Sequence, residues 1–575
     1  MRALGVVVIV VAACGGHASP PAVLPPVAPR LPAPPPGDPD ALGAAYLAGI
    51  AAHLQPAWGQ FLDDCRLRLP ATHPLNTPSL AATAELAIDR AGHLVDVRIA
   101  TSGNADFDLA VREILAEAPQ LVPPPLELLS DDDQAHLRWL FARDRRQAGP
   151  ATAAMVAVAL PVAQVTERLL GQGELARAAR RVVATSATDP DRAHAAERVM
   201  IAALHEALSS GGAARPAAVE AIGRAGVRSL ASEVRALLAP TIDTDLRLLA
   251  IGAVGALGDE AAVPALLTQL PLDLPAHPRL AVAETSALVA LGHRDEAAAA
   301  IRVLLEERGA REVAAFEAHA LAPSPSLAPR LAAWFARGDA AVREAVCSAI
   351  AAEQPDFGVI LRGLRDADAR VRATCVDAAA RVFKPLAEAR RAAGRPGITA
   401  RDPLPASQTA IIRRLLELAK DRDAVVRARA VRAVAVLDPS RHIRAATDAA
   451  PEVRVAAAST ASDAEQRALA ADPDAEVRAA AVAVLADRAP EVVLEAAHDR
   501  SAQVRRAAIA WLVDEDTLQQ LAHDASPDVA TAALVRLTAR RGRAAMTAPL
   551  LTQLVGAPAG SAERVRIALA WLLGP

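Results

Sequence analysis

Aromatic residues are scarce in this chain of 575 residues. Phe, Trp and Tyr together make up 2% of it, although hydrophobic residues as a whole make up 53%. This scarcity argues against one large globular core, in which aromatic side chains usually supply much of the buried area. The composition suits thin seams of Ala, Leu and Val between closely packed helices.

Lysine is almost absent as well, because Lys384 and Lys420 are the only lysines among 62 basic residues. We interpret the abundance of arginine as a result of GC-rich coding, so it is weak evidence for phosphate binding. The formal net charge is −4 and the pI is about 6.4. These values give no electrostatic case for binding to nucleic acid, which we do not expect among the partners.

The sequence motifs that usually accompany enzyme chemistry are missing. The chain has no C-x2-C pair, no H-E-x-x-H, no G-x-S-x-G and no Walker A sequence. We therefore predict no catalytic residue, no metal site and no cofactor, and we infer no small-molecule substrate. An enzyme that acts on a chromophore or a modified protein is an alternative, and it would need an organised acid, base or nucleophile.

Cysteine is also rare, with four residues at Cys14, Cys65, Cys347 and Cys375. Cys347 and Cys375 occupy similar places in adjacent repeats, so a disulfide between them is conceivable in an oxidising compartment. Burial of both as small apolar residues is the interpretation that we favour.

The apolar run near the N-terminus is too short to span a bilayer, which takes about 20 residues. It covers residues 3–13, follows Arg2 and has the pattern of a signal peptide. The Val-Ala-Ala-Cys sequence ending at Cys14 resembles the bacterial lipobox, which implies removal of residues 1–13 and lipid on Cys14. An ordinary signal peptide is the alternative. Because Gly15 replaces the inner-membrane retention Asp, we expect a lipid-anchored, periplasm-facing envelope protein, with the outer membrane favoured.

Residues 14–40 contain too many prolines to pack into a core. We predict a disordered tether with the stiffness of a polyproline helix, which carries the next domain away from the lipid surface. Recognition of this segment by a proline-binding domain is the alternative.

The stretch 472–537 repeats itself. Each copy opens with Asp, reaches Val-Arg or its equivalent about five residues later and continues as an Ala-rich amphipathic run. The opening Asp can accept hydrogen bonds from free N–H groups near a helix start. An arginine falls at the same place in successive copies, namely Arg343, Arg372, Arg427, Arg454, Arg478 and Arg505.

A short period of this kind predicts a solenoid, in which each helix pair buries its apolar face against its neighbours. One longer gap is explained by an insertion at 384–407 that is rich in Arg, Gly and Pro. The pattern resembles HEAT repeats of the short bacterial type, often called phycobilisome-lyase HEAT-like repeats. The resemblance implies a HEAT-type α-solenoid over 151–575, and the lyase name carries no activity with it.

The recurring arginines have a structural and a functional interpretation. We expect this repeat ladder to pair with Asp side chains and carbonyl groups of neighbouring copies; a ligand-facing row is the alternative. The last copy ends with Val565, Leu569 and Leu572 and has no obvious polar cap. Self-association and a tolerated apolar end are both compatible with that pattern.

Residues 41–147 mix helical and strand periods. We predict a helix broken near Pro56, a hairpin, a second helix and a last strand, at 41–62, 83–89, 93–100, 105–118 and 134–142. This order resembles the C-terminal domain of TonB-family proteins, through the turn at 89–92, the Val-x-Val-x-Ile strand, Ser102-Gly103, Phe107-Asp108 with Ala110, and the prolines at 123–125. The fold class is therefore mainly α, with a small α+β domain ahead of the solenoid.

The TonB resemblance implies that the last strand exposes an edge to which a partner's strand can pair, which is β-augmentation. The residues that would form this partner-binding edge are Gln134, His136, Leu137, Arg138, Trp139, Leu140 and Phe141.

The sequence as a whole favours a noncatalytic envelope scaffold that binds protein partners of unknown identity. The alternative is a TonB-like component of receptor-dependent transport across the outer membrane. Two departures from force-transmitting TonB proteins weigh against that alternative. The chain has a lipobox in place of an inner-membrane helix, and its TonB-like domain precedes the solenoid.

Overall fold

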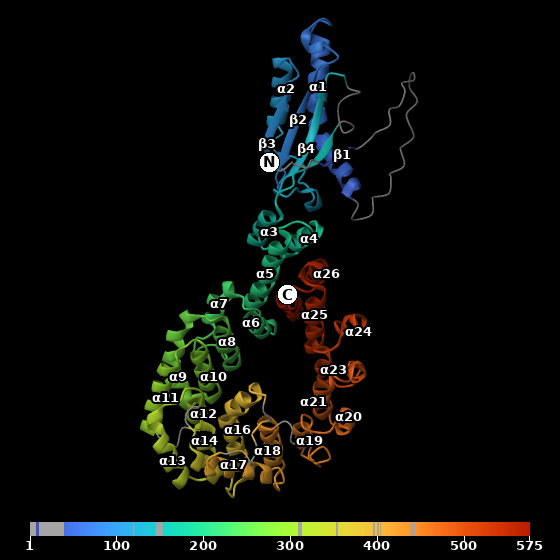
Figure 1. Cartoon of the computed structure of the whole chain (residues 1–575). Helices are drawn as coiled ribbons and strands as arrows, with labels where there is room; N and C mark the ends of the chain where they lie inside the picture. Colours follow the sequence, from blue (N-terminus) through green and yellow to red (C-terminus); the bar gives the residue numbers. More distant parts are fainter. Residues whose placement is uncertain are drawn as a thin grey trace. The chain divides into compact units, whose positions relative to one another are not determined.

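The computed structural model describes residues 7–10, 39–118, 120–144, 153–308, 313–351, 355–394, 397–398, 402, 404–438 and 443–575. The chain divides into two compact units, Met1–Arg168 and Leu169–Pro575 (Figure 1). The predicted lipid attachment site Cys14 and almost all of the predicted tether lie outside the described residues. The helical unit begins at Leu169, whereas the repeat pattern predicts residue 151, because a further strand of the first unit occupies the intervening segment.

The described part of the first unit contains a five-stranded sheet with the order β1-β5-β4-β2-β3. Its strands are β1 (Val7–Val10), β2 (Ala81–Ile88), β3 (Leu94–Ala100), β4 (Ala135–Ala142) and β5 (Ala154–Ala157). All four neighbouring pairs are antiparallel. The pairing of β2 and β4 is the longest and runs from Ala81 opposite Ala142 to Ile88 opposite Ala135. These two strands form the centre of the sheet, and β3 is one of its edges.

Helices α1 (Pro39–Arg68) and α2 (Ala105–Ala116) share one hydrophobic core with alternate residues of β2 and β4. Trp58 of α1 packs edge-on against Phe107 of α2 and Phe141 of β4, with ring centroids 5.3 and 5.0 Å apart. The predicted break of the first helix is wrong, since α1 continues through Pro56. Trp58 and Leu62 lie beyond the proline and are buried, so packing offsets the hydrogen bond that proline cannot donate.

The turn between β2 and β3 is specified by its own residues. Oδ1 of Asp89 accepts hydrogen bonds from the backbone N–H groups of Ala91 and His93 at 2.9 and 2.8 Å. Gly92 has a φ of 90°, and an added Cβ would lie 2.3 Å from the carbonyl oxygen of Leu121. Glycine is therefore required for both reasons.

The helical unit consists of two layers of helices (Figure 1). The inner layer comprises α6 (Ala214–Ala225), α8 (Thr244–Leu257), α10 (Pro278–Ala290), α12 (Val313–Leu321), α14 (Ala340–Ala349), α16 (Ala369–Ala392), α18 (Ala424–Leu437), α19 (Pro451–Ala457), α21 (Ala475–Leu485), α23 (Ala502–Ile509), α25 (Pro527–Arg541) and α27 (Ala562–Leu572). The outer layer comprises α7 (Ala231–Ala236), α9 (Val263–Ala276), α11 (Arg294–Arg308), α13 (Ala328–Arg337), α15 (Phe357–Gly363), α17 (Ala406–Leu418), α20 (Asp463–Ala470), α22 (Pro490–Ala496), α24 (Glu515–Leu521) and α26 (Arg543–Gly556).

Three further helices precede these layers: α3 (Val162–Gly171), α4 (Leu175–Ala184) and α5 (Arg192–Ser210). Short 3-10 turns occur at Pro74–Asn76, Leu126–Leu128, Arg228–Leu230, Glu260–Ala262 and Pro325–Leu327. The chain therefore has the predicted fold class, in which a small α+β domain is followed along the sequence by a mainly α HEAT-type solenoid.

Aspartate residues start many of these helices by accepting hydrogen bonds from the first turn. The capping residues of this kind are Asp243, Asp339, Asp356, Asp368, Asp423, Asp474 and Asp514. The cap of α21 is Asp474, two residues after the Asp472 on which the repeat pattern places it. Asp472 accepts the backbone N–H of Asp474 at 2.9 Å and so fixes the cap itself.

The helical unit closes on itself. Each inner helix packs against the next one in the series, and α27 packs against α5 and α6, while α26 packs against α4. Nη1 of Arg564 donates to Oε2 of Glu206 at 2.6 Å, which joins α27 to α5. Val565 and Leu569 are buried. The apolar side of the last helix is thus covered by the first helices of the same unit.

No helix in the described part of the chain is long and apolar enough to cross a membrane.

Candidate functional site

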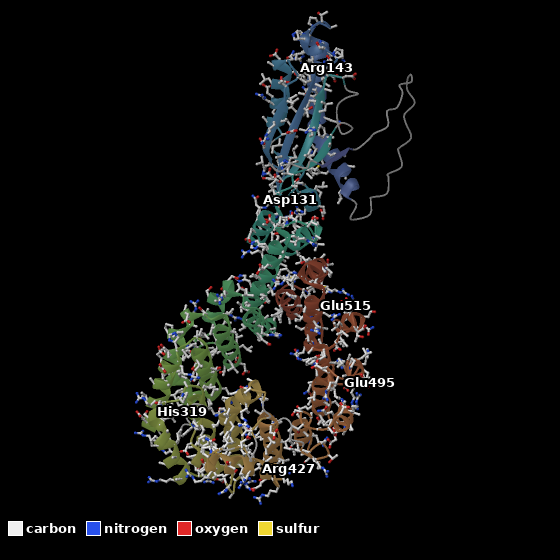
Figure 2. The ribbon with its side chains drawn as sticks, viewed as in Figure 1. Asp131, Arg143, His319, Arg427, Glu495 and Glu515 are labelled. Atoms are coloured by element: carbon white, nitrogen blue, oxygen red, sulfur yellow. A yellow bond between two sulfur atoms is a disulfide. The ribbon has the colours of Figure 1, made fainter. Side chains whose placement is uncertain are left out.

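A row of bidentate Arg–Asp pairs joins successive repeats. Nε and Nη2 of Arg478 donate to the two carboxylate oxygens of Asp499 at 2.8 Å each. Nη1 of the same side chain donates to the carbonyl oxygens of Asp472 and Pro473 at 2.9 and 3.0 Å. The other pairs are Arg343–Asp366, Arg372–Asp421, Arg427–Asp448, Arg454–Asp472 and Arg505–Asp524. Arg427 is labelled in Figure 2.

Each Asp of this row except the last, Asp524, connects two neighbours. The carboxylate of Asp472 accepts from Arg454 at 2.8 Å, and its backbone carbonyl accepts from Arg478 at 2.9 Å. The hydrogen bonds from Arg454 and Arg478 hold the pKa values of the Asp472 and Asp499 carboxyls below their usual range. The row is therefore a continuous charge-assisted network, with its guanidinium groups occupied inside the protein.

Each arginine of the row lies four residues after the N-cap of its helix. Helix α8 has an arginine at the same position, but α10, with Ala281 there, separates it from the row. Arg247 lies four residues after Asp243 and pairs with Asp273 of α9 at 2.7 Å. Ala530 lies four residues after Ser526, the N-cap of α25, so the row stops there. The sequence prediction missed Arg247 because no Val precedes it.

Arg247 also faces a third charged group, Glu284 of α10, at 3.6 Å from its Oε1. Glu284 is fully buried. Burial, and after it the contact with Asp273, raises the pKa of Glu284 to about 9, although Arg247 opposes this shift. Glu284 is consequently a neutral acid near pH 7. These three residues join α8, α9 and α10.

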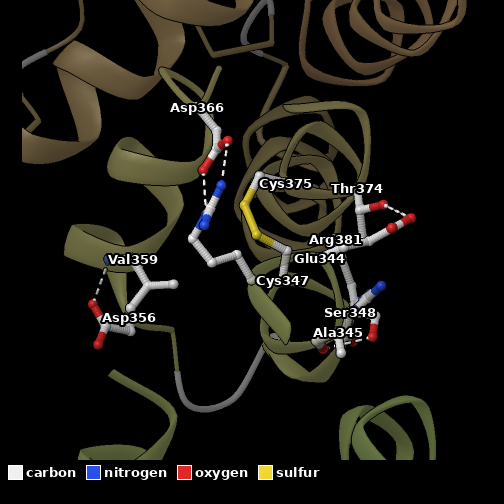
Figure 3. Close-up of a disulfide and its surroundings, with 11 residues drawn as sticks. Glu344, Ala345, Cys347, Ser348, Asp356, Val359, Asp366, Thr374, Cys375 and Arg381 are labelled. Atoms are coloured by element: carbon white, nitrogen blue, oxygen red, sulfur yellow. Dashed lines mark hydrogen bonds and ion pairs between the residues drawn. A yellow bond between two sulfur atoms is a disulfide. The ribbon is translucent and has the colours of Figure 1, made fainter. Parts of the chain in front are cut away.

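Two inner helices are joined by a disulfide between Cys347 of α14 and Cys375 of α16 (Figure 3). The sequence interpretation of two buried free thiols is therefore wrong. The repeat places both residues at equivalent positions of neighbouring helices, 5.0 Å apart between Cα atoms. Gly363 of α15 makes room for the bridge, because an added Cβ would lie 2.0 Å from Sγ of Cys375.

A pocket of about 600 Å³ opens on the inner layer across α10, α12, α14, α16 and α18. Its wall includes the apolar Val282, Leu321 and Ala341 and the carboxylates of Glu317, Glu344 and Asp377. A second pocket, of about 380 Å³, lies where the ring closes and takes its lining residues from α6, α23, α25 and α27. Both pockets are thus lined entirely by inner helices, although the helices of each lie far apart in sequence.

The predicted strand edge on β4 is only partly open. β5 pairs with the first half of β4, with Arg138 opposite Ala154 and His136 opposite Val156. Met155 of β5 is buried in the same core as Leu137, which explains why the extra strand covers this side. Among the described residues, the remaining half of β4, from Trp139 onwards, has a strand partner only on the β2 side.

The side chains of the predicted strand site point alternately to the two faces of the sheet. Leu137, Trp139 and Phe141 are buried against the helices. On the other face His136 contacts Asp132 at 2.6 Å and Arg138 pairs with Glu85 at 2.8 Å. Gln134 precedes the strand. An added strand would therefore contact the backbone of β4 and leave its core side chains in place.

Ionisable side chains in the described residues form no group of three or more His, Cys, Asp or Glu that could hold a metal ion. The buried His319, labelled in Figure 2, is satisfied by protein groups. Its Nδ1 lies 3.1 Å from the carbonyl oxygen of Ala349, and its Nε2 accepts the N–H of Ser324 at 3.1 Å. Burial lowers the pKa of His319.

The structure thus combines two known architectural classes, a closed helical-repeat ring of the HEAT type and a small α+β domain. Residues 43–133 match the family model for the TonB C terminal. No curated protein matches the chain.

Among solved structures, importin beta crystallised in an ammonium sulfate condition is 15% identical, with a TM-score of 0.29, and the similarity covers 71% of this chain and 59% of that chain. A Kap95p structure with RanGDP is 12% identical, with a TM-score of 0.25, and the similarity covers 68% of this chain and 59% of that chain. The present chain therefore spans well under two thirds of either protein. Likenesses this low carry no argument about function.

Proposed function

We propose that this protein is a noncatalytic scaffold of the bacterial cell envelope. A lipid on Cys14 anchors it to a membrane, with the outer membrane favoured, and the tether at 14–40 separates the folded units from the lipid. The helical ring binds protein partners through its inner layer. Neither a cofactor nor a small-molecule substrate is part of this proposal.

The observation that carries the proposal is the position of the two pockets. Every lining residue of both pockets comes from an inner helix. A concave surface built from many similar helices offers a long contact area, which suits a protein partner better than a small ligand.

The match of residues 43–133 to the TonB C terminal supports the envelope location. It also favours a second contact, in which a partner's strand pairs with the uncovered half of β4 or with the edge strand β3. The same match supports a second candidate function, that of a TonB-like component of receptor-dependent outer-membrane transport. Deletion of the gene separates the two, since only the second predicts a loss of uptake of substrates that need such receptors.

Site-specific photo-crosslinking in cells tests the scaffold function. We would place the photoreactive residue at Ala341 or Ala562, which line the two pockets on the inner layer. Matched controls are the exposed Ala299 of α11 and Gln520 of α24 on the outer layer. The proposal predicts one or more discrete protein adducts from the inner positions that the outer positions do not give. Equal or absent adducts from all four positions would contradict it.

A further inference from the structure

The pocket across α10 to α18 has an uneven distribution of charge. Two arginines and three carboxylates line it, but both arginines are committed to protein groups. Nη1 of Arg381 donates to the carbonyl oxygens of Ser348 and Ile350 at 3.0 and 2.6 Å. Nη1 of Arg429 donates to Oδ2 of Asp377 at 2.7 Å. Arg429 is therefore paired with a carboxylate, and Nη1 of Arg381 is directed into the wall of the pocket.

The two remaining carboxylates have only long contacts, or none, in the described part of the chain. Glu317 of α12 is exposed, and no bond of its side chain occurs in the described part of the chain. Glu344 of α14 accepts a long hydrogen bond of 3.4 Å from the neutral hydroxyl of Thr374 and forms a long ion pair of 4.0 Å with Arg370, which is exposed. The lining of the pocket thus has one more carboxylate than it has arginines, beside an apolar wall of Val282 and Leu321.

The wall that carries Glu344 is held rigidly. Figure 3 shows the disulfide between Cys347 and Cys375 to one side of Glu344 and Thr374, which belong to the two helices that it joins. This link fixes the spacing of α14 and α16 one residue away from Ser348 and Thr374, which line the pocket. A rigid wall binds a side chain at a lower entropic cost than a mobile one.

We infer that this pocket binds a basic side chain, arginine or lysine, carried by an extended segment of a protein partner. The inference rests on the proposed scaffold function and names the chemistry that its inner layer recognises. The apolar wall receives the methylene stem of the side chain, and Glu317 and Glu344 pair with its charged end. A free small cation would leave the apolar wall unused.

Peptide mixtures test this inference. We would measure binding of the full-length protein to nine-residue peptides that are random except for the central residue, fixed as Arg, Lys, Glu or citrulline, the neutral analogue of arginine. The test variant is Glu317→Gln with Glu344→Gln. The matched control is Glu495→Gln with Asp516→Asn, which removes the same charge from exposed outer positions (Glu495 is labelled in Figure 2). Thermal unfolding of each variant establishes that it is folded.

The expected result is a preference of about tenfold for Arg and Lys over citrulline, as for one charge-assisted contact. The test variant loses this preference and the control variant keeps it. Absence of binding, equal binding of citrulline, or a preference that survives in the test variant would overturn the inference. Adducts at Ala341 that persist in the test variant would retain the scaffold function and remove only the basic-residue specificity.

Discussion

The side chains of Arg478 and Asp499 form two parallel hydrogen bonds of 2.8 Å that connect α21 to the start of the next repeat. Removing the guanidinium leaves Asp499 and two backbone carbonyls without their donor. We expect Arg478→Ala to lower the free energy of unfolding by about 2 kcal/mol. Denaturant titration followed by circular dichroism measures the effect. The control Arg422→Ala removes an exposed arginine and should change stability by less than about 0.5 kcal/mol.

The lowered carboxyl pKa values of the row predict a loss of stability in acid. In the folded state the arginine hydrogen bonds lower the pKa values of Asp448, Asp472, Asp499 and Asp524 from 3.8. Their stabilisation is present above pH 4 and is lost as the pH falls through the folded values, because the unfolded state then binds more protons. Unfolding curves between pH 5 and pH 2 should show a smaller pH dependence in Asp499→Asn than in the wild type.

The buried Glu284 predicts that the stability of the fold falls, and does not rise, as the pH increases above about 5. Its pKa is raised from 4.5 to about 9 in the folded state, first by burial. The folded protein therefore holds a proton that the unfolded chain has released, and the stabilisation decreases as the pH rises from about 5 to 9. The substitution Glu284→Gln keeps the shape of the side chain but removes its ability to become negatively charged. We expect it to match the wild type near pH 5 and to be more stable near pH 9. A variant that is equally destabilised at both pH values would contradict this assignment.

Local patterns in the sequence predict the repeats and the order of the first domain because their causes are local. Alternating apolar residues specify β2 and β4, and the Asp-x4-Val-Arg pattern specifies a capped helix with an inward arginine. The break predicted at Pro56 is wrong because its cause is not local. Whether a helix continues through a proline depends on the tertiary contacts of Trp58 and Leu62, which no local pattern contains.

The candidate site depends on distant contacts, so the sequence does not reveal it. The contact of Arg564 with Glu206 joins residues at opposite ends of the helical unit. The pocket at Glu317 and Glu344 exists only once five helices have packed. The disulfide follows from the equivalent positions of Cys347 and Cys375 in the repeat, a signal that was present in the sequence. Pairing of β5 with β4 was not predictable from the strand pattern of 134–142 alone.

The lipid anchor predicted at Cys14 can be tested independently of the folded units. Cells supplied with labelled palmitate should incorporate label into the wild-type protein and should fail to do so in Cys14→Ala. After separation of the membranes, we expect the labelled protein in the outer-membrane fraction. An unlabelled wild-type protein that stays in the inner membrane would contradict the lipid anchor and would favour the transport alternative.

The proposed function depends most on closure of the helical ring, because closure brings α6 and α27 together and so forms the second pocket. An added Cβ at Gly560 would lie 2.9 Å from Cβ of Ser210, so a small outward shift of the turn brings the two Cβ atoms to the separation found in disulfides, about 3.5–4.5 Å. Ser210→Cys combined with Gly560→Cys should therefore form an intramolecular disulfide in the folded monomer. Each single variant is a control.

Mass spectrometry of the non-reduced, digested protein detects the linked peptides directly. The account predicts that most molecules of the double variant carry the Ser210→Cys–Gly560→Cys link and that reductant removes it. A folded double variant in which both introduced thiols remain free, or react only between molecules, would show that the two ends of the helical unit do not meet.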